Sequence, residues 1–133
     1  MLFRSVRRIA DGGDVLAAGR PDAPLQVLDA RDLAAFVLAR IDARDCQIYN
    51  ATGPAAPLTW GSLFEDLQSV TGTPVRLHWI DDERLHAEGV RGAELPLWIP
   101  AGPRGTGFYT VSSAKAVGAG LAHRPLRSEE HTS

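Results

Sequence analysis

The chain has 133 residues, 44% of them hydrophobic and 23% charged, with a net charge of −2. This is the composition of a globular domain with one core, and it excludes the basic surface of a nucleic-acid-binding protein. Its apolar runs are far below the roughly 18 residues that span a bilayer. A single cysteine, Cys46, excludes an internal disulfide and a thiolate metal cage. We therefore expect no nucleic acid, no membrane and no metal as partners, and a cytoplasmic location.

In chain order, hydrophobic periodicity and turn residues predict helices that alternate with short strands. The predicted elements are the end of a helix at 6–12, a strand and turn at 14–24, a strand at 25–29, a helix at 29–42, a strand at 46–52, a loop at 53–57, a helix from Thr59 to Gly72, a strand at 75–80, a helix at 81–89, a loop at 91–107, and a strand end with a helix at 108–121. This alternation predicts an α/β fold with at least some parallel pairing.

Polar residues at the predicted helix starts indicate caps. Asp29 is a predicted N-cap, with Asp32 placed to reach back as in a capping box. Thr59 and Ser112 are predicted caps of the later helices. Helical spacing predicts an amphipathic apolar face in the helix at 29–42, formed by Leu33, Phe36, Val37 and Ile41. The same spacing predicts the core face of the next helix, formed by Trp60, Leu63, Phe64, Leu67 and Val70.

Four stretches carry a family resemblance by their order and spacing. They read LQVLDARDLAAFVL, IYNATGP, LTWGSLFEDLQSVTG, and TVSSAKAVGAGL followed by RPL. Together they resemble the C-terminal half of an extended short-chain dehydrogenase/reductase, more narrowly the NAD-dependent epimerase/dehydratase family, over residues 6–126. The resemblance implies the C-terminal portion of a Rossmann-like α/β fold: late sheet strands plus substrate-cap helices, with an incomplete sheet.

In the resembled family the chemistry lies earlier in the chain, on a glycine-rich dinucleotide turn and a Tyr-x-x-x-Lys pair. Neither motif occurs here. Tyr49 is followed four residues on by Gly53, and Tyr109 by Ser113. Lys115 therefore has no tyrosine at that spacing. The resemblance implies no catalytic or cofactor-binding residue in this chain, NAD or NADP for the parent protein, and a small-molecule substrate.

Candidate substrate-binding residues lie in the apolar, proline-rich loop at 91–107, since long loops of this kind often cover a ligand. By the resemblance, Leu97, Trp98 and Pro100 line a pocket over the substrate, with core packing as the equal alternative for Trp98. Many nucleotide-sugar members carry an arginine on the strand that here contains Leu25. Its absence makes a nucleotide-diphosphate sugar a less favoured substrate.

Other polar residues have a structural and a functional interpretation. Asp29 and Asp32 lie where a strand ends, at the edge where α/β folds bind ligands, but capping accounts for both. The acidic run at 81–83 suits a helix dipole better than a metal. His78 falls on the more polar side of its strand, so we expect it to be solvent-exposed rather than catalytic.

The amino-acid sequence at the two ends of the chain indicates a different origin from that of residues 6–126. RSEEHTS at 127–133 is encoded by AGA TCG GAA GAG CAC ACG TCT, a common sequencing adapter. MLFRS at 1–5 is the translation of GTG CTC TTC CGA TCT when GTG is read as a start codon, and this string is the reverse complement of adapter sequence. We therefore expect 1–5 and 127–133 to be adapter-derived and 6–126 to be the natural part. The alternative for 127–133 is an ordinary polar tail.

The resulting hypothesis is a substrate-binding C-terminal fragment of an NAD(P)-dependent oxidoreductase, epimerase or dehydratase. It is expected to be inactive by itself and to bind no cofactor alone. One alternative is a fragment of a non-catalytic NAD(P)-binding regulator or sensor of the same fold. Another is a stand-alone small α/β protein. The substrate, the choice between NAD and NADP, and the oligomeric state stay open at this point.

Overall fold

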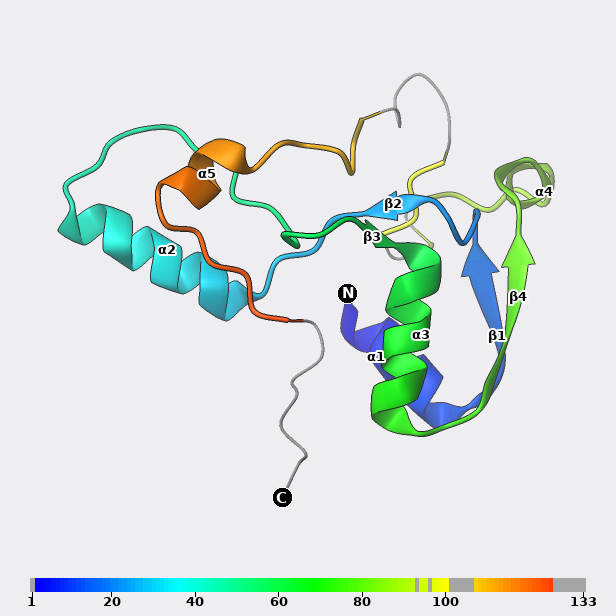
Figure 1. The fold of residues 1–133 in the computed structure, drawn as a ribbon. Coiled ribbons are helices and arrows are strands. Elements are labelled where there is room, and N and C mark those ends of the chain that lie inside the picture. The colour runs from blue at the N-terminus through cyan, green and yellow to red at the C-terminus, as the bar shows by residue number, and fades with distance from the viewer. Residues whose placement is uncertain (1, 93, 96, 101–106, 126–133) are drawn as a thin grey trace. The chain divides into compact units, whose positions relative to one another are not determined.

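The computed structural model describes residues 2–92, 94–95, 97–100 and 107–125, drawn in colour in Figure 1. The chain divides into two compact units. Unit 1 contains residues 1–24 and 59–108, and unit 2 contains residues 25–58 and 109–133. The described helices are too short or too polar to cross a membrane.

Unit 1 is a small α/β unit. It contains α1 (Leu2–Asp11), β1 (Gly13–Ala18), α3 (Trp60–Thr71), β4 (Val75–Ile80) and α4 (Asp82–Ala87). The strands β1 and β4 pair in parallel, and Figure 1 shows α1 and α3 beside them. A small mixed α/β structure with parallel pairing was the expectation from the alternating pattern, and this coarse fold class is confirmed.

The register of the strand pair runs from Gly13 opposite Val75 to Ala18 opposite Ile80. Alternate side chains of β4 are more buried, as the sequence alternation predicts for a strand with one covered face. The aromatic rings on that side form a chain of contacts. Phe64 lies 5.7 Å from the Trp60 ring and 5.8 Å from the Trp79 ring, between centroids. The core of unit 1 is therefore built where α3 meets β4.

The helix α3 begins and ends as its sequence predicts. The Thr59 side chain accepts a hydrogen bond from the Ser62 amide, and the Ser62 hydroxyl accepts one from the Thr59 amide, which completes a capping box. The helix stops at Gly72, whose φ of 66° is the left-handed conformation that glycine adopts at least cost. One expected core residue, Val70 in the last turn of the helix, is 69% exposed.

Unit 2 has a smaller core. It contains α2 (Ala30–Asp42) and the short helix α5 (Ala114–Gly118). Phe36 of α2 is buried against Ala116 and Leu121, which follow late in the chain. The expected apolar face of α2 is only partly used. Of its four residues Phe36 alone is buried, and the others are exposed: Leu33, Val37 and Ile41.

Strands expected in unit 2 are largely missing, and this corrects the sequence prediction. Only Leu25 of the run at 25–29 belongs to a strand, β2 (Pro24–Leu25), which pairs with β3 (Leu58–Thr59). The run at 46–52 has no strand, and neither do the described residues 107–113. Side chains bond the backbone in place of a partner strand. The Gln26 amide, for example, bonds both the carbonyl and the amide of Val111, at 2.9 Å and 3.1 Å.

Candidate functional site

The carboxyl ends of β1 and β4 form the first candidate site, because α/β folds bind ligands at this edge of a parallel sheet. After β1 the chain turns at Gly19, whose amide donates a 2.8 Å hydrogen bond to the carbonyl of Ile80 at the end of β4. After β4 the chain enters α4, with Asp81 as N-cap accepting from the Arg84 amide at 2.7 Å. Two strand ends and a helix start thus meet at one edge.

Trp98 packs on this edge. Its side chain is only 3% exposed, and its indole Nε1 donates a 2.8 Å hydrogen bond to Oδ1 of Asp82. The ring lies 5.7 Å from the ring of His86, one turn further along α4. Gly19 has a φ of 78°, a left-handed conformation that glycine adopts at least cost, and a Cβ there would make only ordinary contact with the indole, at 3.7 Å. Trp98 therefore anchors the 97–100 segment to the start of α4 within unit 1.

The other predicted substrate-binding residues, Leu97 and Pro100, are half-buried on either side of this anchor. Leu97 has a φ of 64°, which is uncommon for a residue with a side chain and is typical of sites fixed by their surroundings. The Trp98 side chain is therefore packed in the core of unit 1. The lining of a substrate pocket by Leu97, Trp98 and Pro100 stays a prediction. The rest of the loop, at 101–106, lies outside the described residues.

A pocket of about 260 Å³ lies at the opposite, amino ends of the same strands. Its lining consists of Gly13, Asp14, Pro74, Val75 and Arg76. Beside it, Oδ1 of Asp14 lies 2.7 Å from His78 Nε2 and 3.4 Å from Arg76 Nη1. His78 is half-exposed, as expected for a histidine on the solvent-facing side of its strand, and it contacts the Asp14 carboxylate.

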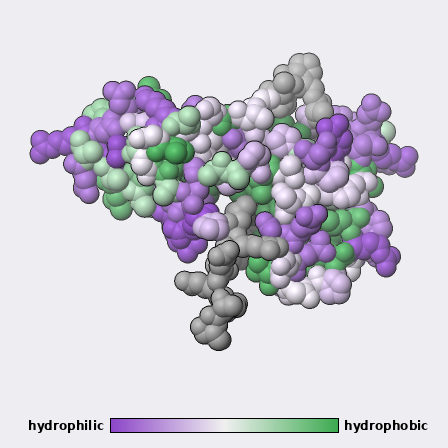
Figure 2. Space-filling model, in the orientation of Figure 1, coloured by the Kyte–Doolittle hydropathy of each residue, from purple (hydrophilic) through white to green (hydrophobic). Residues whose placement is uncertain are grey.

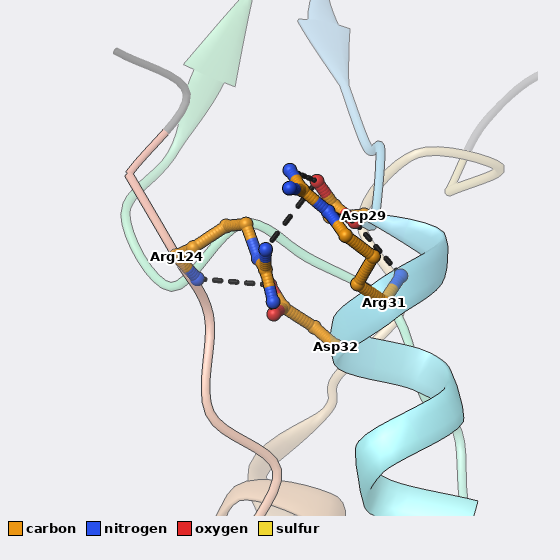
Figure 3. Close-up of polar contacts among 4 residues, drawn as sticks. All are labelled: Asp29, Arg31, Asp32 and Arg124. Carbon is orange, nitrogen blue, oxygen red and sulfur yellow. Dashed lines mark hydrogen bonds and ion pairs between the residues drawn. The ribbon is translucent and has the colours of Figure 1, made fainter. Parts of the chain in front are cut away.

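Unit 2 carries a second polar cluster, at the start of α2 (Figure 3). Oδ1 of Asp29 accepts from the Arg31 amide at 2.8 Å, which confirms the predicted N-cap. Asp32 does not reach back to complete a capping box. Instead it accepts from the backbone amide of Arg124 at 2.9 Å and from its Nε at 2.6 Å. The chain before residue 126 is thereby tied to the first turn of α2.

These contacts keep both carboxylates ionised. The Arg31 guanidinium holds the pKa of Asp29 far below its ordinary value, and the Arg31 amide adds to the effect. The Arg124 amide, together with its guanidinium, lowers the pKa of Asp32 against the opposing effect of burial. Both acids are therefore committed to charged partners, and neither is set up as a proton donor or acceptor near neutral pH.

The structure brings Tyr49 and Lys115 together although their spacing in sequence gave no such indication. Lys115 Nζ lies 4.9 Å from the centroid of the Tyr49 ring and donates to the Ile48 carbonyl at 3.0 Å. The Tyr49 hydroxyl donates to Asp45 at 2.6 Å, and this bond raises the tyrosine pKa. A tyrosine that exchanges a proton near neutral pH needs a lowered pKa. The pair is thus a packing contact of unit 2.

Sequence reasoning missed the partners that fix these sites. Arg124 was recognised only as part of RPL, and Asp82 only as part of an acidic run at a helix start. The pairing of Asp32 with Arg124 joins residues 92 positions apart, which no local spacing encodes. Among the described residues, no group of three or more His, Cys, Asp and Glu side chains is arranged to hold a metal ion.

Comparison with protein-family models, curated proteins and solved structures finds no match. The family resemblance therefore rests on the quoted stretches of sequence.

Proposed function

We propose that residues 6–126 form the substrate-binding C-terminal part of an NAD(P)-dependent oxidoreductase, epimerase or dehydratase of the extended short-chain type. The resemblance of the four stretches supplies the family. The observation that carries the substrate-binding role is the position of Trp98 at the carboxyl ends of β1 and β4. Ligands of α/β proteins bind at this edge.

The site combines a fixed indole ring with two neighbouring half-buried side chains for contact with a ligand. The anchor is the Trp98 indole, held by Asp82 through Nε1. The surface is the half-buried pair Leu97 and Pro100 on either side of it. Apolar side chains supply most of the contact area in small-molecule sites, with a few polar groups for orientation. A small, largely apolar substrate is the class that this arrangement favours.

A nucleotide-diphosphate sugar is less favoured. The strand position where the resembled enzymes carry a diphosphate-binding arginine is occupied by buried Leu25. The nearest arginine upstream, Arg20, is paired with Asp22 at 3.1 Å. A diphosphate bound here would therefore lack the bidentate arginine contact that suits phosphate groups.

The first experiment is to recover the longer DNA locus that matches codons 6–126 and to translate it upstream. A glycine-rich strand–turn–helix and a Tyr-x-x-x-Lys in frame would support the enzyme. The glycine-rich turn without the Tyr-x-x-x-Lys would favour a non-catalytic sensor. A native start codon just before Val6 and a stop just after Leu126 would contradict the proposal and favour a stand-alone small protein.

The second experiment uses the longer protein with its substrate. We expect Trp98→Phe, which keeps an aromatic ring but loses the bond to Asp82, to raise KM about tenfold with little change in kcat. Trp60→Phe is the matched control, because Trp60 is also a buried indole of unit 1, at 8% exposure. Equal effects of the two variants on KM would contradict a substrate-binding role for the Trp98 segment.

A further inference from the structure

The helix α2 has two parallel stripes of side chains, and only one of them packs. Asp32, Phe36 and Arg40 repeat every four residues and face the rest of unit 2. The neighbouring stripe is apolar and open. Its members Leu33, Val37 and Ile41 are 40%, 46% and 64% exposed, and Leu38 beside them is 62% exposed. The better hydrophobic stripe of the helix is therefore the one that remains uncovered.

The space-filling view shows hydrophobic residues at the surface in the part of the molecule that holds α2 and α5 (Figure 2). A contiguous apolar stripe on a helix is typical of an interaction surface, because burial of such side chains contributes about 25 cal/mol per Å² of apolar area. Single exposed apolar side chains need no explanation, but four on adjoining turns of one helix do.

Along one border of this stripe, the charge is positive at the start of α2 and negative at its end. Arg31 lies in the first turn and Asp42 is the last residue of the helix. They are eleven positions apart, close to three full turns, so both lie along the same border of the stripe. Both side chains are exposed. A second helix of the same sequence, laid antiparallel, would place each arginine beside the other helix's aspartate.

We propose that the α2 stripe of Leu33, Val37, Leu38 and Ile41 is an interface between two copies of this chain, packed antiparallel about Val37. In that arrangement Leu33 of one copy lies beside Ile41 of the other, and the two Val37 side chains meet at the two-fold axis. Arg31 already binds Asp29 at 2.7 Å. Its guanidinium has five N–H donors, which is enough to accept Asp42 of the second copy as well.

A second copy fits the stripe better than an unrelated peptide does, because the border charges complement themselves under a two-fold rotation. The size of the interface sets its strength. Thirteen residues of helix extend about 20 Å. A pair of such helices buries less than the roughly 1,200 Å² of a stable interface, so the dimer is weak and reversible.

The test is sedimentation equilibrium of the full chain from about 5 to about 500 μM, the range that brackets a weak dimer. We expect a monomer–dimer equilibrium that Val37→Glu weakens at least about tenfold, because it buries two unpaired carboxylates at the axis. The matched control is Ala39→Glu, which adds the same charge on the exposed, opposite side of α2. Circular dichroism of each variant verifies that the helix content is unchanged.

A second variant tests the antiparallel register. Asp42→Arg places like charges together at both ends of the interface, and we expect a several-fold weaker dimer at low salt and a smaller effect at high salt. A wild-type chain that stays monomeric at all concentrations overturns the proposal. If Val37→Glu then also lowers the melting temperature and Ala39→Glu does not, the stripe is covered within one chain. Equal weakening by Val37→Glu and Ala39→Glu also overturns it.

Discussion

The two units of this chain are closed by different kinds of contact. Unit 1 is closed by aromatic side chains, with Phe64 between the rings of Trp60 and Trp79. Unit 2 has one buried aromatic residue, Phe36, and is closed mainly by polar links between distant positions. These links join Gln26 to Val111, Asp32 to Arg124, Ile48 to Lys115, and Thr52 to His123.

The difference predicts unequal strength. Burial of a large apolar side chain contributes about 1.5–3 kcal/mol, whereas a hydrogen bond contributes about 0.5–1.5 kcal/mol net. A unit held mainly by polar links is therefore expected to open first and to respond to pH. The same reasoning makes unit 1 the more reliable support for a binding site at Trp98.

The largest expected effect comes from truncation of the aromatic core. Phe64→Ala should destabilise unit 1 by about 3–5 kcal/mol, because it removes a buried ring between two indoles. Hydrogen exchange should show the loss at β1 and β4. Phe36→Ala is the counterpart in unit 2 and should expose the amides of α2 instead. If either variant loses protection equally in both units, the units fold as one, and the comparison fails.

The next effect comes from removal of the link between Asp32 and Arg124. Arg124→Ala removes the guanidinium from a mostly buried carboxylate and leaves it only the backbone amide of residue 124, so exchange in the first turn of α2 should quicken about tenfold. Amides of β4 should not change. Arg20→Ala, which removes an exposed arginine from an ion pair with Asp22, is the control and should have little effect. A similar response to both variants would mean that the link does not hold unit 2 closed.

Acid should weaken unit 2 before unit 1. Hydrogen bonds lower the pKa of Asp32 and of Asp45, in the latter case chiefly from the Tyr49 hydroxyl. A lowered pKa means that the unfolded chain binds more protons than the folded one between the two values. The stabilisation is thus complete above the unfolded value of about 3.9 and is lost as the pH falls below it.

The measurement is hydrogen exchange in each unit at a series of pH values from about 6 down to about 2, which lie on both sides of the unfolded value. Asp32→Asn should reduce the acid response of unit 2 to the part that Asp45 contributes, since the amide does not titrate. The control Asp22→Asn, at an exposed position of unit 1, should leave the response unchanged. An acid response confined to unit 1 would contradict the prediction.

The smallest effects concern two glycines in open space. Gly72 ends α3 with a φ of 66°, and a Cβ there would meet nothing within 4 Å. Gly72→Ala should therefore cost about 1 kcal/mol through backbone strain alone. Gly118 of α5 is equally open but not left-handed, so Gly118→Ala should stabilise unit 2 by about 0.4–1 kcal/mol. Chemical denaturation resolves the two signs, and the same sign for both would refute the backbone explanation.

The sequence predicted unit 1 better than unit 2 for a physical reason. The N-cap Thr59, the stop at Gly72 and the alternation in β4 are local signals, and each was confirmed. Parallel pairing followed from the alternation of strands and helices. These signals depend on residues that are only a few positions apart, so they can be read from the spacing of residue types in the sequence.

The strands expected in unit 2 did not form, because an apolar run becomes a strand only when it pairs with a neighbouring strand. In the first run, the Gln26 side chain bonds the backbone of Val111. In the second run, Lys115 donates to the Gln47 side chain and the Ile48 carbonyl, and His123 bonds the Thr52 carbonyl. The candidate site divides in the same way. Trp98 was found from its apolar loop, but its partner Asp82 and the role of Arg124 depend on tertiary contacts. Periodicity contains no information on these.

The bond between the Gln26 side chain and the Val111 backbone has a consequence for how this chain tolerates sequence change. A backbone ladder survives most substitutions, since every residue except proline carries the same amide and carbonyl. A link made by a side-chain amide is lost when that one residue is substituted. Unit 2 is joined at several places in this way, through Gln26, Lys115, His123 and Arg124. In a mutational scan, sensitive positions in unit 1 should therefore form a broad apolar set that accepts conservative exchange. In unit 2 they should also include isolated polar positions that accept little exchange.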